Sequence, residues 1–538
     1  MSTNRAYITL SVALALVFFS TSVSGQSPSN KPNGTNKENA AAQEPRLANP
    51  ENKIAAEERQ RDELKDEIDA VKAENAAVRE LLRRMAEQQK TLLEQVDRLQ
   101  RRLDAGTATD VSMARPGVPL PTAEASAADA ALKTPPASQE NDDRYQDGII
   151  ISKTRDDARV PFLLTFNNNT QIRYLNTLDS NETFTDHLGN VHEVHRRNDI
   201  TVNRSMFILG GYIFDKKLRY SLMVWTSLGS ASMFVAGNIG WQFNKRFTLM
   251  AGYTGVPGSR SMVNTFPFYT GADRSMADNF FRPGFTQGAW AFGEIAKNLN
   301  YQAFVGNGLN TLNISAAKID THLLFSGSLW WEPLGNYGEP GKSVNMYDDY
   351  FARKKLRIRV GTSFTRSRED RFSNLDQSSP ENTSLYNSDG VLTFSTGAFA
   401  PGITVDKGTY KMWAIDSGIK YKGLAVNGQY YLRWLSDFVA DGPIPINSTF
   451  DHGYELSASY FVVPKKVLVY VRGSEVFGQF GNSYEYAGGV KWHFLPTERL
   501  WLNVELMRVN RAPYTGSFTP YTAGMNGWVP MVQTVIAF

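Results

Sequence analysis

Basic side chains recur at alternate positions in the C-terminal two thirds of the chain. Around residue 358, for example, Arg357 and Arg359 alternate with apolar Ile358 and Val360. A period of two is typical of a β-strand with one apolar and one polar face. Cations on the polar face of a sheet that encloses water would attract anions. Eight cations of this kind are candidates for lining such a pore: Arg173, Arg219, Arg246, Arg357, Arg359, Arg433, Arg472 and Lys491.

A segment at 256–286 carries three further cations, Arg260, Arg274 and Arg282. It also holds two acidic residues, and its apolar content is unusual for a loop in water because it includes Phe266, Phe268, Tyr269, Phe280 and Phe281. We expect the loop to fold inward, bury its aromatic rings and form a constriction. The alternative is a loop at the rim that packs against a neighbouring subunit. For all these cations, a second alternative is that they pair with acidic residues and contribute no net field.

The elements that must position these residues are sixteen predicted β-strands between 162 and 538, joined alternately by tight turns and long polar loops. The connection at 333–354 is an exception, because it is long where a short turn is expected. An even number of strands of about ten residues with asymmetric loops is the pattern of outer-membrane barrels. The strands of a soluble β-sandwich would also alternate apolar and polar residues. We therefore predict an all-β, 16-stranded antiparallel transmembrane β-barrel over 146–538, preceded by an N-terminal α-helical coiled coil.

The N-terminal third has a different composition. Arg5 precedes an apolar run and then small residues, which predicts a secretory signal peptide rather than a transmembrane helix. Pro-rich or Asn-rich linkers flank a long helical segment that contains no glycine and no proline. The predicted order of segments is signal peptide 1–25, disordered linker 26–50, periplasmic coiled coil 51–104, Pro/Ala-rich linker 105–145 and barrel 146–538.

The segment 51–104 fits a heptad repeat without a skip, with apolar residues at most a and d positions. Asn75 and Gln89 occupy a positions, where polar residues fix the register at a cost in stability. The pattern predicts a homo-oligomer, and we expect a trimer, although the repeat alone leaves two strands and three strands open. A solitary amphipathic helix is the alternative, but it would leave this apolar seam in water.

Composition excludes several classes of protein. The 538 residues contain no cysteine, which rules out disulfide scaffolds and thiolate chemistry. The formal net charge of +3 gives no basis for nucleic-acid binding. No Gly-x-Ser-x-Gly motif occurs, and we predict neither an enzyme nor a cofactor. His187, His192 and His195 with Glu193 could in principle bind a metal, but such polar loops are usually only solvated, so we predict no metal site.

Several motifs resemble those of the phosphate-selective porin O and P family of bacterial outer-membrane porins. The resemblance covers about 147–538 and rests on Arg197-Asn198-Asp199, Arg204, Gly210-Gly211, Phe247 to Tyr253, Pro257-Gly258, Arg274, Pro283-Gly284, Gly288, Asn300-Tyr301 and Val305 to Gly308. It implies a 16-stranded trimeric channel with an anion-attracting constriction. Three positions depart from the family pattern by removing charge: Met206, Gly255 and Phe285-Thr286.

The resulting functional hypothesis is an outer-membrane porin for passive diffusion of small solutes, with a preference for anions and with phosphate as one candidate anion. Its expected partners are outer-membrane lipid, small anionic solutes and, through the coiled coil in the periplasm, peptidoglycan or another cell-wall component. The alternative hypothesis is a structural tether, in which the coiled coil links the outer membrane to the cell wall and the barrel is only an anchor.

Overall fold

The computed structural model describes residues 145, 148–227, 233–311, 316–340, 344–375 and 383–538. The chain divides into two units at Lys133 and Thr134, and the described residues belong to the second unit. The predicted signal peptide, first linker, coiled coil and, apart from Tyr145, second linker lie outside the described residues and stay predictions.

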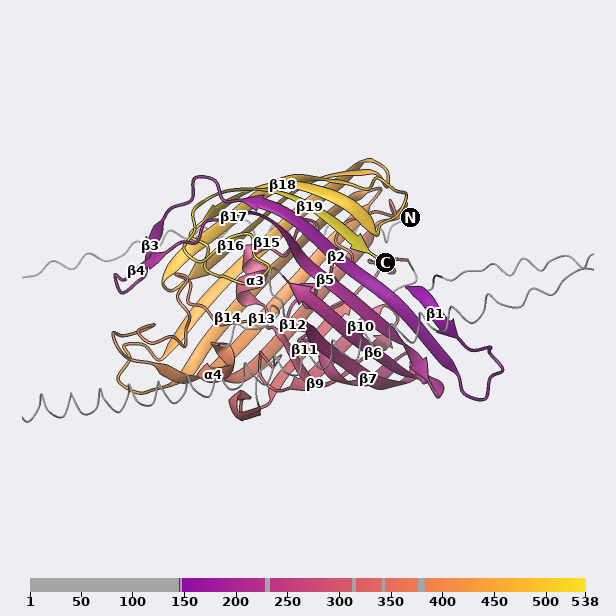
Figure 1. Cartoon of the computed structure of the whole chain (residues 1–538), viewed down its shortest axis with the longest axis horizontal. Coiled ribbons are helices and arrows are strands. Elements are labelled where there is room, and N and C mark those ends of the chain that lie inside the picture. The colour runs from indigo at the N-terminus through magenta and orange to yellow at the C-terminus, as the bar shows by residue number, and fades with distance from the viewer. Residues whose placement is uncertain (1–144, 146–147, 228–232, 312–315, 341–343, 376–382) are drawn as a thin grey trace, which may run out of the picture. The chain divides into compact units, whose positions relative to one another are not determined.

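The described residues form a ring of sixteen antiparallel strands, β2 and β5 to β19, in which each strand pairs with its neighbours in the chain (Figure 1). The strands are β2 (Phe162–Asn176), β5 (Asn198–Ile213), β6 (Asp215–Ser227), β7 (Phe234–Asn244), β8 (Phe247–Gly255), β9 (Phe285–Ala296), β10 (Leu299–Gly306), β11 (Leu324–Trp331), β12 (Arg357–Asp370), β13 (Val405–Tyr421), β14 (Leu424–Ala440), β15 (Ser448–Val463), β16 (Val467–Gly478), β17 (Gly481–Trp492), β18 (Leu500–Asn510) and β19 (Gly527–Ala537).

The ring closes because the last strand pairs with the first. β19 runs antiparallel to β2, with Gln533 opposite Arg173. A short additional strand, β1 (Ile149–Lys153), pairs with the other end of β2 and was not predicted. Closure leaves no free sheet edge, which confirms the predicted all-β, 16-stranded antiparallel barrel. The predicted strands coincide with the observed ones, although β13, β14 and β15 extend several residues further into the long-loop side.

Polarity in this barrel is reversed relative to a soluble protein. In β17, Glu485 and Lys491 are buried inside the ring, whereas Tyr486 and Val490 on the opposite face are 47% and 41% exposed. The same alternation recurs around the wall, so the interior is lined by polar groups and the outer surface is apolar. This arrangement suits a barrel whose outer surface faces lipid.

Tight turns lie at one end of the barrel and long connections at the other. Between β13 and β14, Lys422 and Gly423 have φ angles of 50° and 87°, as a two-residue type I′ hairpin turn requires. The β7–β8 turn consists of Lys245 and Arg246. Arg246 therefore lies in a turn at the rim, which corrects its predicted place on a strand face. The physical reason is that β7 ends at Asn244 and β8 begins only at Phe247, so the alternation of strand faces does not extend to Arg246.

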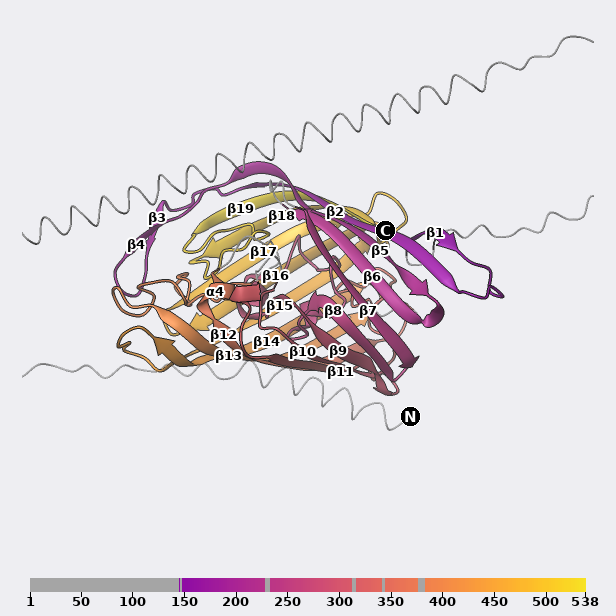
Figure 2. The same cartoon turned by 60° about the horizontal axis from the view of Figure 1, so that its bottom comes forward.

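The connections also contain short elements that alternation could not predict. They are β3 (Thr183–Thr185), β4 (Val191–Glu193), η1 (Arg260–Met262), α3 (Met276–Phe281), η2 (Ala316–Lys318) and α4 (Arg371–Asn374). β3 and β4 form a small separate hairpin in the first long loop (Figure 2). Among the described residues, no helix has the length and apolar character needed to cross a bilayer.

Candidate functional site in the barrel interior

The loop between β8 and β9 lies inside the barrel. Nearly all its residues from 256 to 284 are buried, and α3 packs against β14, β15 and β16; Figure 1 shows α3 within the ring of strands. Ser275 begins this helix, since its hydroxyl accepts a hydrogen bond from the Asp278 backbone N–H at 3.1 Å. The inward fold of the loop is as expected, and the rim-loop alternative is wrong.

Aromatic contacts hold the loop against the wall. The Phe281 ring stacks on Tyr431 with centroids 5.2 Å apart, and the Tyr410 hydroxyl donates to the Phe281 carbonyl at 2.6 Å. The Arg433 guanidinium lies 3.8 Å from the Phe280 ring centroid. Burial of these rings removes apolar surface from water, which stabilises the inward position by roughly 25 cal/mol per Å².

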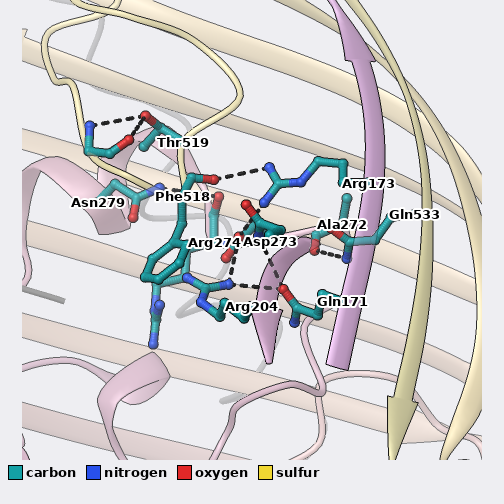
Figure 3. A network of polar contacts seen from close by, with 12 residues as sticks. Gln171, Arg173, Arg204, Ala272, Asp273, Arg274, Asn279, Phe518, Thr519 and Gln533 are labelled. Atoms are coloured by element: carbon teal, nitrogen blue, oxygen red, sulfur yellow. Dashed lines mark hydrogen bonds and ion pairs between the residues drawn. The ribbon is translucent and has the colours of Figure 1, made fainter. Parts of the chain in front are cut away.

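One carboxylate of the loop contacts two cations of the wall. Asp273 Oδ2 lies 2.9 Å from Arg204 Nη1 and 3.3 Å from Arg173 Nη2 (Figure 3). The Arg204 guanidinium also lies 3.6 Å from the Phe518 ring centroid. Burial disfavours the Asp273 carboxylate, but Arg204 and Arg173 outweigh it and lower the pKa of Asp273 to about 2. The site therefore carries more positive than negative charge.

Most of the other predicted wall cations are paired with acidic residues. Their closest nitrogen–oxygen distances are 2.8 Å for Arg359–Asp416, 2.7 Å for Arg433–Asp451, 2.6 Å for Arg472–Glu485 and 2.7 Å for Lys491–Asp348. In the loop, Arg274 lies 3.6 Å from Asp278. For these five cations, pairing leaves little free positive charge, which is the second alternative raised by the sequence.

Arg260 has a different environment. Its Nη1 donates to Asn427 Oδ1 at 2.9 Å, and its guanidinium carbon lies 4.1 Å from the Tyr347 ring centroid and 5.1 Å from that of Tyr337. No described carboxylate forms an ion pair with it. Amide oxygens and aromatic faces thus hold a buried positive charge without neutralising it.

Arg282 is the other loop cation without an ion pair among the described residues. Its side chain is buried, and Nη1 contacts Met262 Sδ at 3.6 Å and the Pro283 carbonyl at 3.4 Å. Its Nε has no hydrogen-bond partner within the described ranges. Both Arg260 and Arg282 therefore contribute positive potential to the interior.

Three predicted cations remain accessible to solvent. Arg219 lies on the inward face of β6, and its Nε donates to Gln242 Oε1 at 3.0 Å in a solvent-exposed position. Arg357 donates to the Leu334 carbonyl at 2.6 Å. Arg246 is exposed in its turn. Because none of them has an acidic partner in the described ranges, they can act on ions in water.

Sequence reasoning missed the second segment that enters the barrel. The connection after β11, whose length was the irregularity at 333–354, buries Tyr337, Met346 and Tyr347 inside. Lys420 anchors it from β13 by donating to the Tyr337 and Met346 carbonyls at 3.0 and 2.7 Å. The unusual length at the short-turn end was the only signal of this segment.

Two of the three histidines of the first long loop contact separate acidic residues. His187 Nδ1 lies 2.5 Å from Asp389 Oδ2, and His192 Nε2 lies 2.8 Å from Asp186 Oδ2. Within the described part of the chain, no group of three histidine or acidic residues could hold a metal ion. The His187–Asp389 pair joins this loop to the loop that carries Asp389, whereas the His192–Asp186 pair lies within the first long loop itself.

No protein-family profile and no curated protein sequence matches this chain. Several solved structures are similar to the barrel. OmpT of Vibrio cholerae, expressed in the outer membrane, has 11% sequence identity and a TM-score of 0.44, over 72% of this chain and all of that one. The outer membrane channel DcaP of Acinetobacter baumannii has 7% identity and a TM-score of 0.42, over 72% of this chain and all of that one. An anion-selective porin from Comamonas acidovorans has 10% identity and a TM-score of 0.40, over 70% and 99% of the two chains.

Proposed function

We propose that the protein is an outer-membrane porin that lets small solutes diffuse passively through its barrel. The observation that carries this proposal is the reversed polarity of a closed ring. An apolar outer wall and a polar interior satisfy the demands of lipid outside and water inside. The solvent-exposed contact between Arg219 and Gln242 supports the presence of water beside the β6–β7 wall.

We further propose a preference for anions. The charges that support it are the two guanidiniums beside Asp273, the loop residues Arg260 and Arg282, which have no ion pair with a described residue, and the accessible Arg219 and Arg357. Fixed positive charge in a narrow passage through a low-dielectric wall raises the local concentration of anions. The substrates would be small anions as a class, and inorganic phosphate would be one of them. A dedicated phosphate site is not proposed, because the departures at Met206 and Gly255 remove charge that such a site would use.

The same proposal places the barrel in the bacterial outer membrane, with the short turns and the N-terminal coiled coil in the periplasm. The predicted heptads at 51–104 support self-association, for which we propose three copies. A coiled coil raises the local concentration of the barrels that it joins. Peptidoglycan or another cell-wall component is the proposed partner of its outer surface.

The tether is a second candidate function. Two buried segments, 256–284 and the region around Tyr347, occupy the interior, which favours a barrel that serves only as an anchor. Conductance of the purified full-length protein in planar bilayers separates the two functions. A porin gives stepwise ionic current, whereas an anchor with a filled lumen gives none even when fully inserted.

A further inference from the structure

Five exposed lysines lie on three connections at the short-turn end of the barrel. Lys354 and Lys355 precede β12, Lys422 lies in the β13–β14 turn, and Lys465 and Lys466 lie in the β15–β16 turn. We call these five residues the lysine patch. All five side chains are exposed, and none forms an ion pair with a described acidic residue.

Backbone hydrogen bonds join the three connections that carry the patch. The Lys422 N–H donates to the Arg353 carbonyl at 2.9 Å, and the Phe461 N–H donates to the Gly423 carbonyl at 3.1 Å. The lysines are therefore held on adjacent turns of one rigid rim rather than scattered on separate loops.

Three acidic residues of the same region are buried or paired with other groups. Asp349 is buried and accepts the Arg353 and Gly423 N–H groups at 3.0 and 2.8 Å. Asp348 is buried against Lys491. Glu498 pairs with Arg499 at 3.1 Å. The rim therefore presents exposed lysine charge, while Asp348 and Asp349 are buried and Glu498 is paired with Arg499.

The wall directly above the patch is apolar and exposed. Tyr421 ends β13, and Leu424 pairs across the strands with Tyr460. Val462 and Val463 end β15, and Val462 is half exposed. An apolar wall that ends in lysines meets acyl chains and charged headgroups at the same time, because a lysine stem can lie on the wall while its ammonium reaches the interface.

We propose that the lysine patch binds the phosphate groups of anionic phospholipids in the leaflet that surrounds the short-turn rim. Aromatic and aliphatic side chains would contact the acyl chains, and several ammonium groups would share one phosphate. A free anion or a soluble polyanion would use the lysines but not the apolar wall, so the continuity of the two surfaces favours lipid. This inference rests on the proposed membrane-spanning role.

The test compares lipids retained by the full-length protein. The protein is placed in nanodiscs of equal phosphatidylglycerol and phosphatidylcholine, released into the gas phase and scored for bound lipids by native mass spectrometry. The wild type should retain phosphatidylglycerol at least about threefold over phosphatidylcholine, and added salt should weaken the preference by screening. A variant with all five lysines changed to Gln should lose the preference.

Two variants control for folding and for charge elsewhere. Changing the same five lysines to Arg should keep the preference. Neutralising exposed cations that lie away from the short-turn rim, by Arg196→Gln with Arg366→Gln, should also keep it. Equal retention of both lipids by the wild type, or an unchanged preference in the Gln variant, would overturn the proposal.

Two further outcomes would also overturn it. Displacement of phosphatidylglycerol by millimolar inorganic phosphate would assign the patch to free anions. Loss of binding to purified cell wall in the Gln variant, with lipid retention intact, would assign it to a glycan. Conductance of the same wild-type sample tests the porin function separately. If the protein retains phosphatidylglycerol but carries no current, the porin function is contradicted and lipid binding by the lysine patch still stands.

Discussion

The Arg260 guanidinium lies 4.1 Å from the ring centroid of Tyr347 and thereby joins two segments that enter the barrel from opposite ends. Around this contact, the Tyr347 N–H donates to the Phe268 carbonyl at 3.1 Å, and Asn345 Oδ1 accepts from Arg260 Nε at 3.4 Å. The loop after β8 and the connection after β11 are therefore one interlocked unit. Any solute that crosses the barrel must pass beside it.

Arg260→Ala should loosen this unit. Hydrogen bonds to a charged group contribute about 1.5–3 kcal/mol each, so the variant should melt at a lower temperature and show noisier, larger unit currents. Tyr337→Phe is a matched control, because it keeps the ring beside Arg260 and removes only the hydroxyl, which donates to Asn427 Oδ1 at 2.6 Å and contacts the Ile419 carbonyl at 3.5 Å. Quiet currents of wild-type size in Arg260→Ala would show that the junction does not shape the passage.

Arg219→Gln should reduce the preference for anions. A unit charge about 8 Å from an ion in water contributes about 0.5 kcal/mol, or roughly a factor of two in the permeability ratio. Reversal potentials in a salt gradient measure this ratio. Arg219→Lys keeps the charge and should keep the selectivity. An unchanged ratio in Arg219→Gln would place the ion path away from β6.

Asp273→Asn should raise the anion preference and destabilise the barrel, because Arg173 and Arg204 would lose their shared carboxylate. The folded pKa of Asp273, about 2, lies below the unfolded value, so its ionisation stabilises the fold above about pH 4. That contribution is lost as the pH falls through 2. The melting temperatures of wild type and variant should therefore converge between pH 4 and pH 2, and a constant difference would contradict this assignment.

Asp320 gives the opposite dependence on pH. Burial and the neighbouring Glu369 raise the pKa of Asp320 to about 9, so the folded protein holds a proton that the unfolded chain releases near pH 4. Stability should fall as the pH rises from about 4 to about 9. Asp320→Asn should remove this slope, since its amide can donate to Glu369. Exposed Asp179→Asn should leave the slope unchanged, and a slope that persists in Asp320→Asn would contradict the shared proton.

The strands were predictable because a wall with a polar inner face and an apolar outer face imposes strict alternation. Glu485, Tyr486, Val490 and Lys491 show the pattern in one strand. The tight turns at Lys422-Gly423 and at 464–466 were also predictable from turn chemistry. β1 was not, since a five-residue strand contains too few positions to show a period.

Charge pairing inside the barrel could not be read from the sequence. Alternation places Arg433 on the inward face but does not reveal Asp451, which lies on the neighbouring strand at the position set by register. The partner of Arg204 comes from a loop, Asp273, and no spacing rule connects them. The tyrosines around Arg260 were hidden for the same reason, since an irregular connection has no period that predicts its path.

The central claim is that water and ions pass through the barrel, and single-channel recording of the full-length protein in planar bilayers tests it most directly. The proposal predicts discrete current steps whose size grows with salt concentration and whose reversal potential shows a preference for anions. Insertion without any current steps, verified by recovery of folded protein from the bilayer, would contradict the channel and leave the barrel as an anchor.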